Sequence, residues 1–327
     1  MSSFRSYPAE CDRSRLKKQP GQCQTLSAML SLALTIGLFS AACRAPTQPA
    51  SPDRVVDSAQ SIETGSQPVT VLTLVAIPWQ NSAEQQSKLQ ELAAYLREKS
   101  GIAIQVEMTA SYEEAVDLLT EEKVQLAYLG AFTYIKARDR NPQLEPLVVP
   151  IEKTTGRPWY TSVIVVRADG GIQTLEDLKG KRFSFVSASS TSGFLLPSVQ
   201  FQELGIDPEQ DFSTVEYSGG HNKSAEILAA GKVDAIATES QAYSRESQFG
   251  VLAAENYKVI WESDPIPNGP LVVSSQLPNT LKLALSKALL NAPDGLADIS
   301  GAESSGYSIA ADSDYDSIRR LQAALKP

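Results

Sequence analysis

The sequence has few of the residues that build disulfide frameworks and metal sites. Among its 327 residues there are three cysteines and one histidine, and the cysteines (Cys11, Cys23 and Cys43) all lie near the N-terminus. The rest of the chain contains no thiol, so no disulfide can link its parts and no cysteine there can act as a nucleophile. We therefore expect no disulfide framework, no metal site and no cofactor.

Basic residues are also too few for a protein that binds nucleic acid. The chain has 29 Lys and Arg against 38 Asp and Glu, a formal net charge of −9. Nucleic-acid binding normally needs a basic surface, so this partner class is not expected. With 42% hydrophobic and 20% charged residues, the composition is that of an ordinary globular protein. The length suffices for about two domains or lobes.

The N-terminal region has the pattern of an export signal. Basic residues within 13–18 precede an uncharged run from Leu26 to Ala42, which ends in the small residues Ser40-Ala41-Ala42. A basic flank, an apolar core and small residues before a cleavage point are typical of a secretory signal peptide. A membrane span normally needs about 20 apolar residues, so the shorter run favours cleavage over a permanent anchor, which is the alternative.

The cysteine after this run, Cys43, makes the ending resemble a bacterial lipobox, in which the cysteine is lipidated and becomes the first mature residue. Ser40 departs from that pattern, because leucine is common three positions before the cysteine. We expect a signal peptide over 1–42 and, after lipidated Cys43, a flexible tether over 43–68. The protein would then lie in the periplasm, lipid-anchored to the membrane; ordinary signal cleavage without lipid is a further alternative.

The folded body alternates predicted strands and helices in two successive regions. The first region contains strands over 69–77, 102–108 and 124–128, with helices over 85–99 and 112–122 between them. The second contains strands over 161–167, 182–186, 212–217 and 233–237, with helices over 174–180, 193–204 and 224–230 between them. Strands joined by helices are typical of parallel sheets in α/β folds.

The predicted architecture is therefore α/β, with two α/β lobes and a ligand cleft between them. We expect the first lobe over 69–160 and the second over 161–275. Helices over 276–327 should return to the first lobe.

The segment 182–193 is the strongest candidate binding motif. A strand leads through a hydroxyl-rich turn into a helix, which places Ser190, Thr191 and Ser192 at the helix N-terminus. Free backbone N–H groups and the helix dipole make that position favourable for an anion. One hydroxyl would suffice to cap the helix, so three in succession indicate binding in addition to capping.

Two further turns at strand ends carry candidate binding residues. The single histidine, His221, follows two glycines between a predicted strand and a predicted helix. Tyr128 and Tyr134 flank Gly130 at the end of another strand, where each hydroxyl can donate one hydrogen bond. The alternatives are that His221 is an ordinary surface or core residue and that the tyrosines only pack.

These turns resemble the substrate-binding proteins of ABC transporters for phosphonate, phosphite and phosphate, over about residues 71–290. The resemblance depends on the order and spacing of several short motifs. They are Tyr112 at the start of the second helix, Tyr-x-Gly-x-x-x-Tyr at 128–134, Thr-Leu-Glu-Asp-Leu-Lys-Gly at 174–180, Ser-Thr-Ser-Gly at 190–193, Ser-Gly-Gly-His at 218–221, Gly-Lys-Val-Asp at 231–234 and Pro-Ile-Pro-Asn at 265–268.

The resemblance implies a class II periplasmic binding fold that captures a phosphorus oxyanion between its lobes and delivers it to an ABC permease. In that family the Ser-Thr-Ser turn and the histidine hold the phosphorus-bound oxygens, and tyrosines of the first lobe close the other side. A carboxyl group that meets a ligand proton or amine often follows the Gly-Lys-Val-Asp motif. Carried over by position, the implied site residues are Ser190, Thr191, Ser192, His221, Tyr112, Tyr128, Tyr134 and Glu239, with Ser240 as the alternative to Glu239.

The resemblance implies a monomer without catalytic residues. The sequence departs from the family pattern at a few positions. Ala131 replaces a proline, and Ser187 and Ser189 stand in a turn that is commonly Asp-Pro-Ala. Two other functions stay open. The same cleft would serve a sensor that signals to a membrane receptor. A serine hydrolase would use Ser192 and His221, although the sequence lacks a Gly-x-Ser-x-Gly nucleophile elbow.

Overall fold

The computed structural model describes residues 71–79, 82–153, 155–296 and 304–325, which belong to one compact unit of the chain, Thr64–Pro327. The predictions for the signal peptide, the tether and lipidated Cys43 lie outside the described residues. None of the helices in the described ranges combines the length and the apolar character that a membrane span requires.

The first sheet has six strands in the order β13-β4-β12-β3-β1-β2. These strands are β1 (Val71–Ala76), β2 (Ala103–Met108), β3 (Leu126–Tyr128), β4 (Glu145–Glu152), β12 (Leu271–Val273) and β13 (Ser304–Ile309). As the alternation with helices predicts, β1 runs parallel to both β2 and β3, whereas β12 pairs antiparallel with β3 and β4. Because β1 is covered on both faces, Leu74, Val75 and Ala76 are fully buried.

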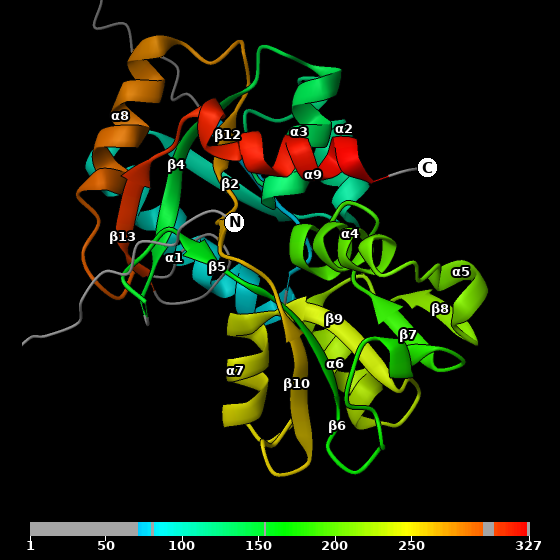
Figure 1. The fold of residues 1–327 in the computed structure, drawn as a ribbon. Helices are drawn as coiled ribbons and strands as arrows, with labels where there is room; N and C mark the ends of the chain where they lie inside the picture. Colours follow the sequence, from blue (N-terminus) through cyan, green and yellow to red (C-terminus); the bar gives the residue numbers. More distant parts are fainter. Residues whose placement is uncertain (1–70, 80–81, 154, 297–303, 326–327) are drawn as a thin grey trace, which may run out of the picture. The chain divides into compact units, whose positions relative to one another are not determined.

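The helices that accompany this sheet are α1 (Ser82–Ser100), α2 (Tyr112–Thr120), α3 (Ala131–Arg140), α8 (Asn279–Leu290) and α9 (Asp316–Ala324). α1 buries the face that carries Leu89, Leu92 and Leu96. α2 is capped by Ser111, whose hydroxyl accepts the N–H of Glu114. α9, near the C-terminus, packs against α3 (Figure 1).

The second sheet has five strands in the order β10-β6-β9-β7-β8. These strands are β6 (Ser162–Arg167), β7 (Arg182–Phe185), β8 (Thr214–Tyr217), β9 (Ala235–Glu239) and β10 (Tyr257–Glu262). β7 runs parallel to β8 and β9, and β6 is antiparallel to β9 and β10. The accompanying helices are α4 (Leu196–Glu203), α5 (Pro208–Asp211), α6 (His221–Ala229) and α7 (Ser240–Gln248). Their core includes the contacting rings of Phe183, Phe201 and Phe212.

Within the described residues the chain crosses between the two sheets twice, and the two crossings pair with each other. β5 (Trp159–Tyr160) lies on the way from β4 to β6, and β11 (Ile266–Pro267) lies on the way back from β10 to β12 (Figure 1). The two short strands pair antiparallel, Ile266 with Tyr160 and Pro267 with Trp159. The predicted two-lobed α/β fold is confirmed, with both connections between the lobes running side by side.

The return to the first lobe comes earlier than the boundary at 275/276 that we expected. β12, at Leu271–Val273, pairs with β3 and β4 of the first sheet, so it belongs to the first lobe. A short apolar run shows that a strand is buried but does not show which sheet it joins. The C-terminal part also contains a strand, β13, between its two helices, where the sequence indicated helices alone.

Helix starts in the second lobe also differ from the prediction. The helix expected over 193–204 begins as a π-helical turn, η2 (Thr191–Leu195), and continues as α4. The helix expected at 224–230 begins three residues earlier, at His221. Both shifts move a predicted site residue from a loop into the first turn of a helix.

Candidate functional site

The hydroxyl-rich turn after β7 is buried and contacts the first lobe. Ser190, Thr191 and Ser192 are each at most 2% exposed. Ser190 is the cap, since its Oγ accepts the N–H of Gly193 at 3.0 Å. The Oγ1 atom of Thr191 accepts the N–H of Phe132, in the first turn of α3, at 2.9 Å. One hydroxyl of the turn therefore caps the helix, while the next joins the two lobes.

Two tyrosines lie against this turn. The hydroxyl of Tyr112, the first residue of α2, lies near the side chain of Ser190, and that of Tyr160 in β5 lies near the side chains of Ser192 and Thr191. Burial, and then the nearby carboxyl group of Glu239, raise the pKa of both phenols far above their ordinary value of 10. Both phenols are therefore neutral at physiological pH, so their hydroxyls can donate hydrogen bonds. The sequence pointed to Tyr112 but not to Tyr160.

The single histidine lies at the N-terminus of α6, close to the same group of residues. Its Nδ1 atom is 2.8 Å from Oγ1 of Thr238, and its backbone N–H donates to the carbonyl of Trp79 at 3.0 Å. Burial, and then the positive charge of Arg245, lower the pKa of His221 to about 3. The imidazole is therefore neutral at physiological pH, with one nitrogen as donor and the other as acceptor.

Replacing His221 with glutamine should remove part of the acid sensitivity of the fold. Because the folded-state pKa of about 3 lies below the ordinary 6.5, the unfolded chain takes up this proton first as the pH falls. Stability from this group is complete above about pH 6.5 and is lost as the pH falls toward 3. Between about pH 7.5 and about pH 4.5 the loss is roughly 2.5 kcal/mol. Urea unfolding at both pH values gives the loss in the free energy of unfolding. This loss should be smaller by that amount in His221→Gln than in the wild type; equal losses in the two proteins would contradict a buried neutral histidine.

Trp79, at the carboxyl end of β1, lies at the centre of these residues, and sequence reasoning missed it. Its Nε1–H donates to Oε1 of Glu239, at the end of β9, over 2.6 Å. Its rings stack on Tyr128, with centroids 5.5 Å apart and planes 14° apart, and lie 5.7 Å from the His221 ring. The signal that could have found it is its place: β1 and β3 are parallel neighbours, so Trp79, which follows β1, and Tyr128, the last residue of β3, lie at the same sheet edge.

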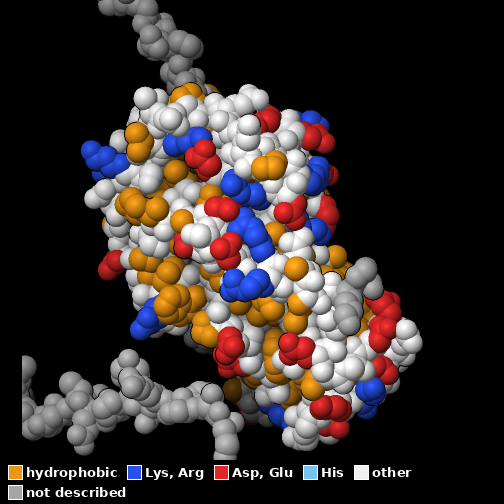
Figure 2. Space-filling view, turned by 45° about the horizontal axis from the view of Figure 1, so that its top comes forward, with side chains coloured by type: hydrophobic (Ala, Val, Ile, Leu, Met, Phe, Trp, Pro, Cys, Tyr) orange, Lys and Arg blue, Asp and Glu red, His pale blue; other side chains and the backbone are white. Residues whose placement is uncertain are grey.

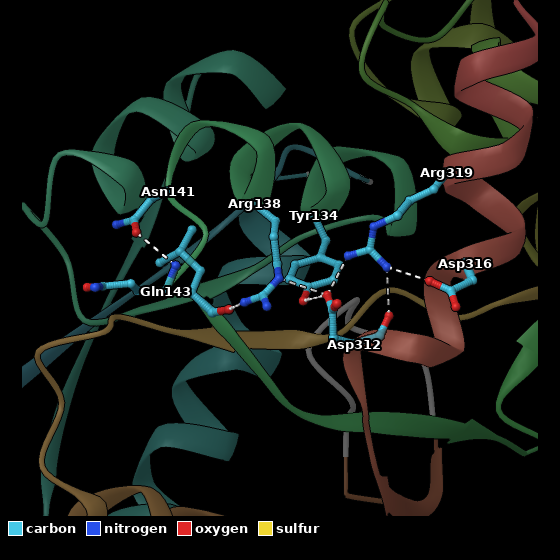
Figure 3. Close-up of polar contacts among 8 residues, drawn as sticks. Tyr134, Arg138, Asn141, Gln143, Asp312, Asp316 and Arg319 are labelled. Atoms are coloured by element: carbon cyan, nitrogen blue, oxygen red, sulfur yellow. Dashed lines mark hydrogen bonds and ion pairs between the residues drawn. The ribbon is translucent and has the colours of Figure 1, made fainter.

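One predicted site residue, Tyr134, points elsewhere. Its hydroxyl donates to Oδ1 of Asp312 at 2.5 Å, and Asp312 also pairs with Arg138 and Arg319 (Figure 3). This cluster joins α3 to α9 within the first lobe. Tyr134 lies in the second turn of α3, whereas the first turn carries the N–H that meets Thr191. The structure thus brings together every predicted site residue except Tyr134.

A small hollow adjoins the buried group at the surface. It has a volume of about 280 Å³, and its lining includes Tyr112 and Glu113 of α2 and Ser187 and Tyr217 of the second lobe. Oε1 of Glu113 accepts hydrogen bonds from the hydroxyls of Ser189 at 2.8 Å and Ser187 at 3.3 Å. The two serines that depart from the family pattern therefore bond to the first lobe beside the site, outside the Ser-Thr-Ser turn itself.

The hydrogen-bond donors of the buried group carry no charge, in contrast to many side chains on the outer surface. Acidic and basic side chains lie interspersed over the visible face of the molecule (Figure 2). The buried group instead offers hydroxyls, a neutral imidazole and an indole N–H, with Glu239 as the carboxyl group among the residues named. Buried polar groups are costly unless hydrogen-bonded, and several of these groups bond to protein partners around the turn.

Two α/β lobes joined by paired crossings, with buried polar groups from both lobes in contact, define a two-lobed solute-binding protein. A family model for the periplasmic phosphonate-binding protein of ABC transporters matches residues 74–315. The chain belongs to this family of substrate-binding proteins.

Individual relatives agree with this assignment. The chain is 30% identical over 253 residues to the phosphate-import protein PhnD of Mycolicibacterium smegmatis, and the alignment covers 75% of each chain. It is 29% identical over 193 residues to the phosphonates-binding periplasmic protein of Escherichia coli, and this alignment covers 57% of this chain and 56% of that one. The structure of a binding-protein component of a Pseudomonas aeruginosa ABC phosphonate transporter superposes with a TM-score of 0.70 at 24% identity, over 77% of this chain and 85% of that one.

Proposed function

We propose that the protein captures a phosphorus oxyanion between its lobes and delivers it to the permease of an ABC transporter. Family membership supports the transport role. The observation that carries the ligand class is the buried, neutral donor set formed by Ser190, Thr191, Ser192, His221 and Tyr112. Neutral donors in a water-excluded site hold an anion well, because the low local dielectric strengthens each hydrogen bond.

The geometry also links binding to closure of the lobes. Thr191 of the second lobe meets an α3 amide of the first, and Tyr112 of the first lobe meets Ser190 of the second. An anion held by these groups would therefore contact both lobes at once. Binding would favour the arrangement in which the lobes touch, because a ligand shifts an equilibrium toward the state that it contacts better. A permease can then recognise the loaded protein by its shape.

The site geometry does not favour the alternative of a serine hydrolase. In a Ser-His-Asp triad the second ring nitrogen of the histidine donates to a carboxylate. Here Nδ1 of His221 lies beside the hydroxyl of Thr238, at 2.8 Å. The Ser192 backbone carbonyl accepts a hydrogen bond from Ser162, which fixes that residue as part of the turn. We infer a binding role for both Ser192 and His221.

The proposed function is tested by calorimetric titration of the ligand-free mature protein. Phosphate, phosphite, methylphosphonate and 2-aminoethylphosphonate are the ligands, and sulfate is the control anion. We expect saturable one-to-one binding of at least one phosphorus anion with at least about tenfold preference over sulfate. Binding of none of the four by protein that is folded and ligand-free would overturn the proposal.

We also propose that the protein is anchored to the membrane through lipid on Cys43. Replacing Cys43 with alanine should move the protein from the detergent phase to the aqueous phase in a detergent-partitioning assay of cells that express it. The reason is that attached acyl chains supply membrane affinity in proportion to their length, about 0.8 kcal/mol for each buried CH₂ group. Unchanged partitioning would contradict the lipid anchor and favour an uncleaved apolar segment.

A further inference from the structure

Trp79 occupies a position that bears directly on which ligand the site accepts. The residue follows β1 and is 7% exposed, so its indole is almost wholly inside the protein. The ring lies against Tyr128 on one side and near the imidazole of His221 on another, while its N–H reaches Glu239. A large aromatic side chain thus fills the space between three of the residues that the family resemblance assigns to the ligand.

The main chain of Trp79 is held at both ends. Its N–H donates to Oε1 of Gln85, at 3.3 Å, and the Gln85 side-chain amide donates in turn to the carbonyl of Ile77. The Trp79 carbonyl accepts the backbone N–H of His221 at 3.0 Å. With the backbone fixed in this way, a ligand cannot displace the indole without breaking its buried hydrogen bond to Glu239.

The choice of ligand depends on the partner of the indole N–H as well as on the space that the ring fills. Glu239 is 2% exposed, and its carboxyl group lies close enough to Tyr112 and Tyr160 to raise the pKa of both. An ammonium group on a ligand would need this carboxyl group as its counter-ion. The indole N–H already occupies Oε1 of that group, so an ammonium group would have to reach the other oxygen past the Trp79 ring, which lies against Tyr128 and near His221.

From these contacts we infer that Trp79 is a specificity-determining residue, which restricts the ligand to small phosphorus oxyanions without a charged or bulky organic substituent. This inference rests on the proposed function. The favoured class is phosphate, phosphite and methylphosphonate. Phosphonates with an aminoalkyl or aryl substituent are excluded, because the ring takes their space and its N–H occupies one oxygen of the carboxyl group that an amine would need.

Two substitutions separate these effects. Trp79→Phe removes the N–H and keeps an aromatic ring against Tyr128, whereas Trp79→Ala also empties the space. The matched control is Trp261→Phe, the same change in β10, where the ring is partly buried against the hydrophobic core. Calorimetry with methylphosphonate, 2-aminoethylphosphonate and phenylphosphonate gives the affinity ratios, and circular dichroism shows that each variant is folded.

In the wild-type protein methylphosphonate should bind at least about tenfold more tightly than either larger ligand. Trp79→Phe should raise the affinity for 2-aminoethylphosphonate, relative to that for methylphosphonate, by about tenfold. Adding Glu239→Gln to that variant should abolish the gain in affinity. Trp79→Ala should likewise raise the affinity for phenylphosphonate relative to that for methylphosphonate. Trp261→Phe should leave both ratios unchanged. If Trp79→Ala does not fold, Trp79→Phe still decides the question.

Two results would overturn the inference. One is a wild-type protein that binds 2-aminoethylphosphonate as tightly as methylphosphonate. The other is an affinity ratio that is the same in wild type and Trp79→Phe. Folded protein that binds none of the phosphorus anions would instead overturn the proposed function, and with it the inference, so the two failures are distinguishable.

Discussion

Replacing Thr191 with valine should weaken binding of the phosphorus oxyanion about tenfold to a hundredfold, which corresponds to roughly 1.5–3 kcal/mol. Valine keeps the shape of threonine and removes its hydroxyl. That hydroxyl is a candidate donor to the ligand and also accepts the N–H of Phe132 from the first lobe, at 2.9 Å. Valine therefore removes a ligand contact and leaves an amide unpaired when the lobes close, and both effects lower affinity. Calorimetric titration measures the change.

Two further variants accompany this measurement. His221→Ala should weaken the same ligands, because the neutral imidazole at the start of α6 is lost. Ser187→Ala is the control: its hydroxyl bonds to Glu113 beside the surface hollow, so affinity should change little. If Thr191→Val and His221→Ala both leave the affinity for every phosphorus oxyanion unchanged, the assignment of the site is wrong.

The second large effect concerns stability, and we expect Gly269→Ala to cost about 3 kcal/mol. A Cβ atom at position 269 would lie 2.1 Å from the carbonyl oxygen of Leu129 and 3.0 Å from Cα of Gly130. Both are backbone atoms of the turn that leads into α3, so neither can move aside as a flexible side chain could. The turn itself must shift, and it carries the α3 amide that meets Thr191.

Thermal unfolding should show this cost as a fall in Tm of roughly 6–12 °C for a protein of this size. Gly170→Ala is the matched control, because a Cβ there is exposed and its nearest neighbours, both in Arg167, lie at 3.4 and 3.6 Å. A Tm that is equal in the two variants would contradict the close approach of Gly269 to the Leu129–Gly130 turn.

Much of the fold could be predicted from the sequence because its signals are local. The face of α1 that carries Leu89 and Leu96 has the helical period, and the apolar run of β1 is that of a parallel strand. β12 was assigned to the wrong lobe because the partner of a short strand is decided by tertiary packing, which leaves no mark on its own residues. β13 was missed because Ser304–Ile309 contains few of the apolar residues that indicate a strand.

The candidate site was predictable where residues follow strand ends, and less so elsewhere. Ser190–Ser192 and His221 stand at strand-to-helix turns, and such turns meet at one edge of a parallel sheet. Tyr160 was missed because its two-residue strand has no periodicity, and its contact with Thr191 depends on how the lobes meet. Tyr134 was assigned to the site from its spacing in a motif, but one helical turn beyond Gly130 its side chain reaches Asp312 instead.

The proposed binding site is tested most sharply by the position of phosphorus in a crystal structure of the protein with methylphosphonate bound. We expect the phosphonate oxygens within hydrogen-bonding distance of the hydroxyls of Ser190, Thr191 and Ser192 and of the His221 ring, with its methyl group beside Trp79. Phosphorus in the surface hollow lined by Glu113 and Ser187, or anywhere else away from the buried turn, would contradict this assignment of the site.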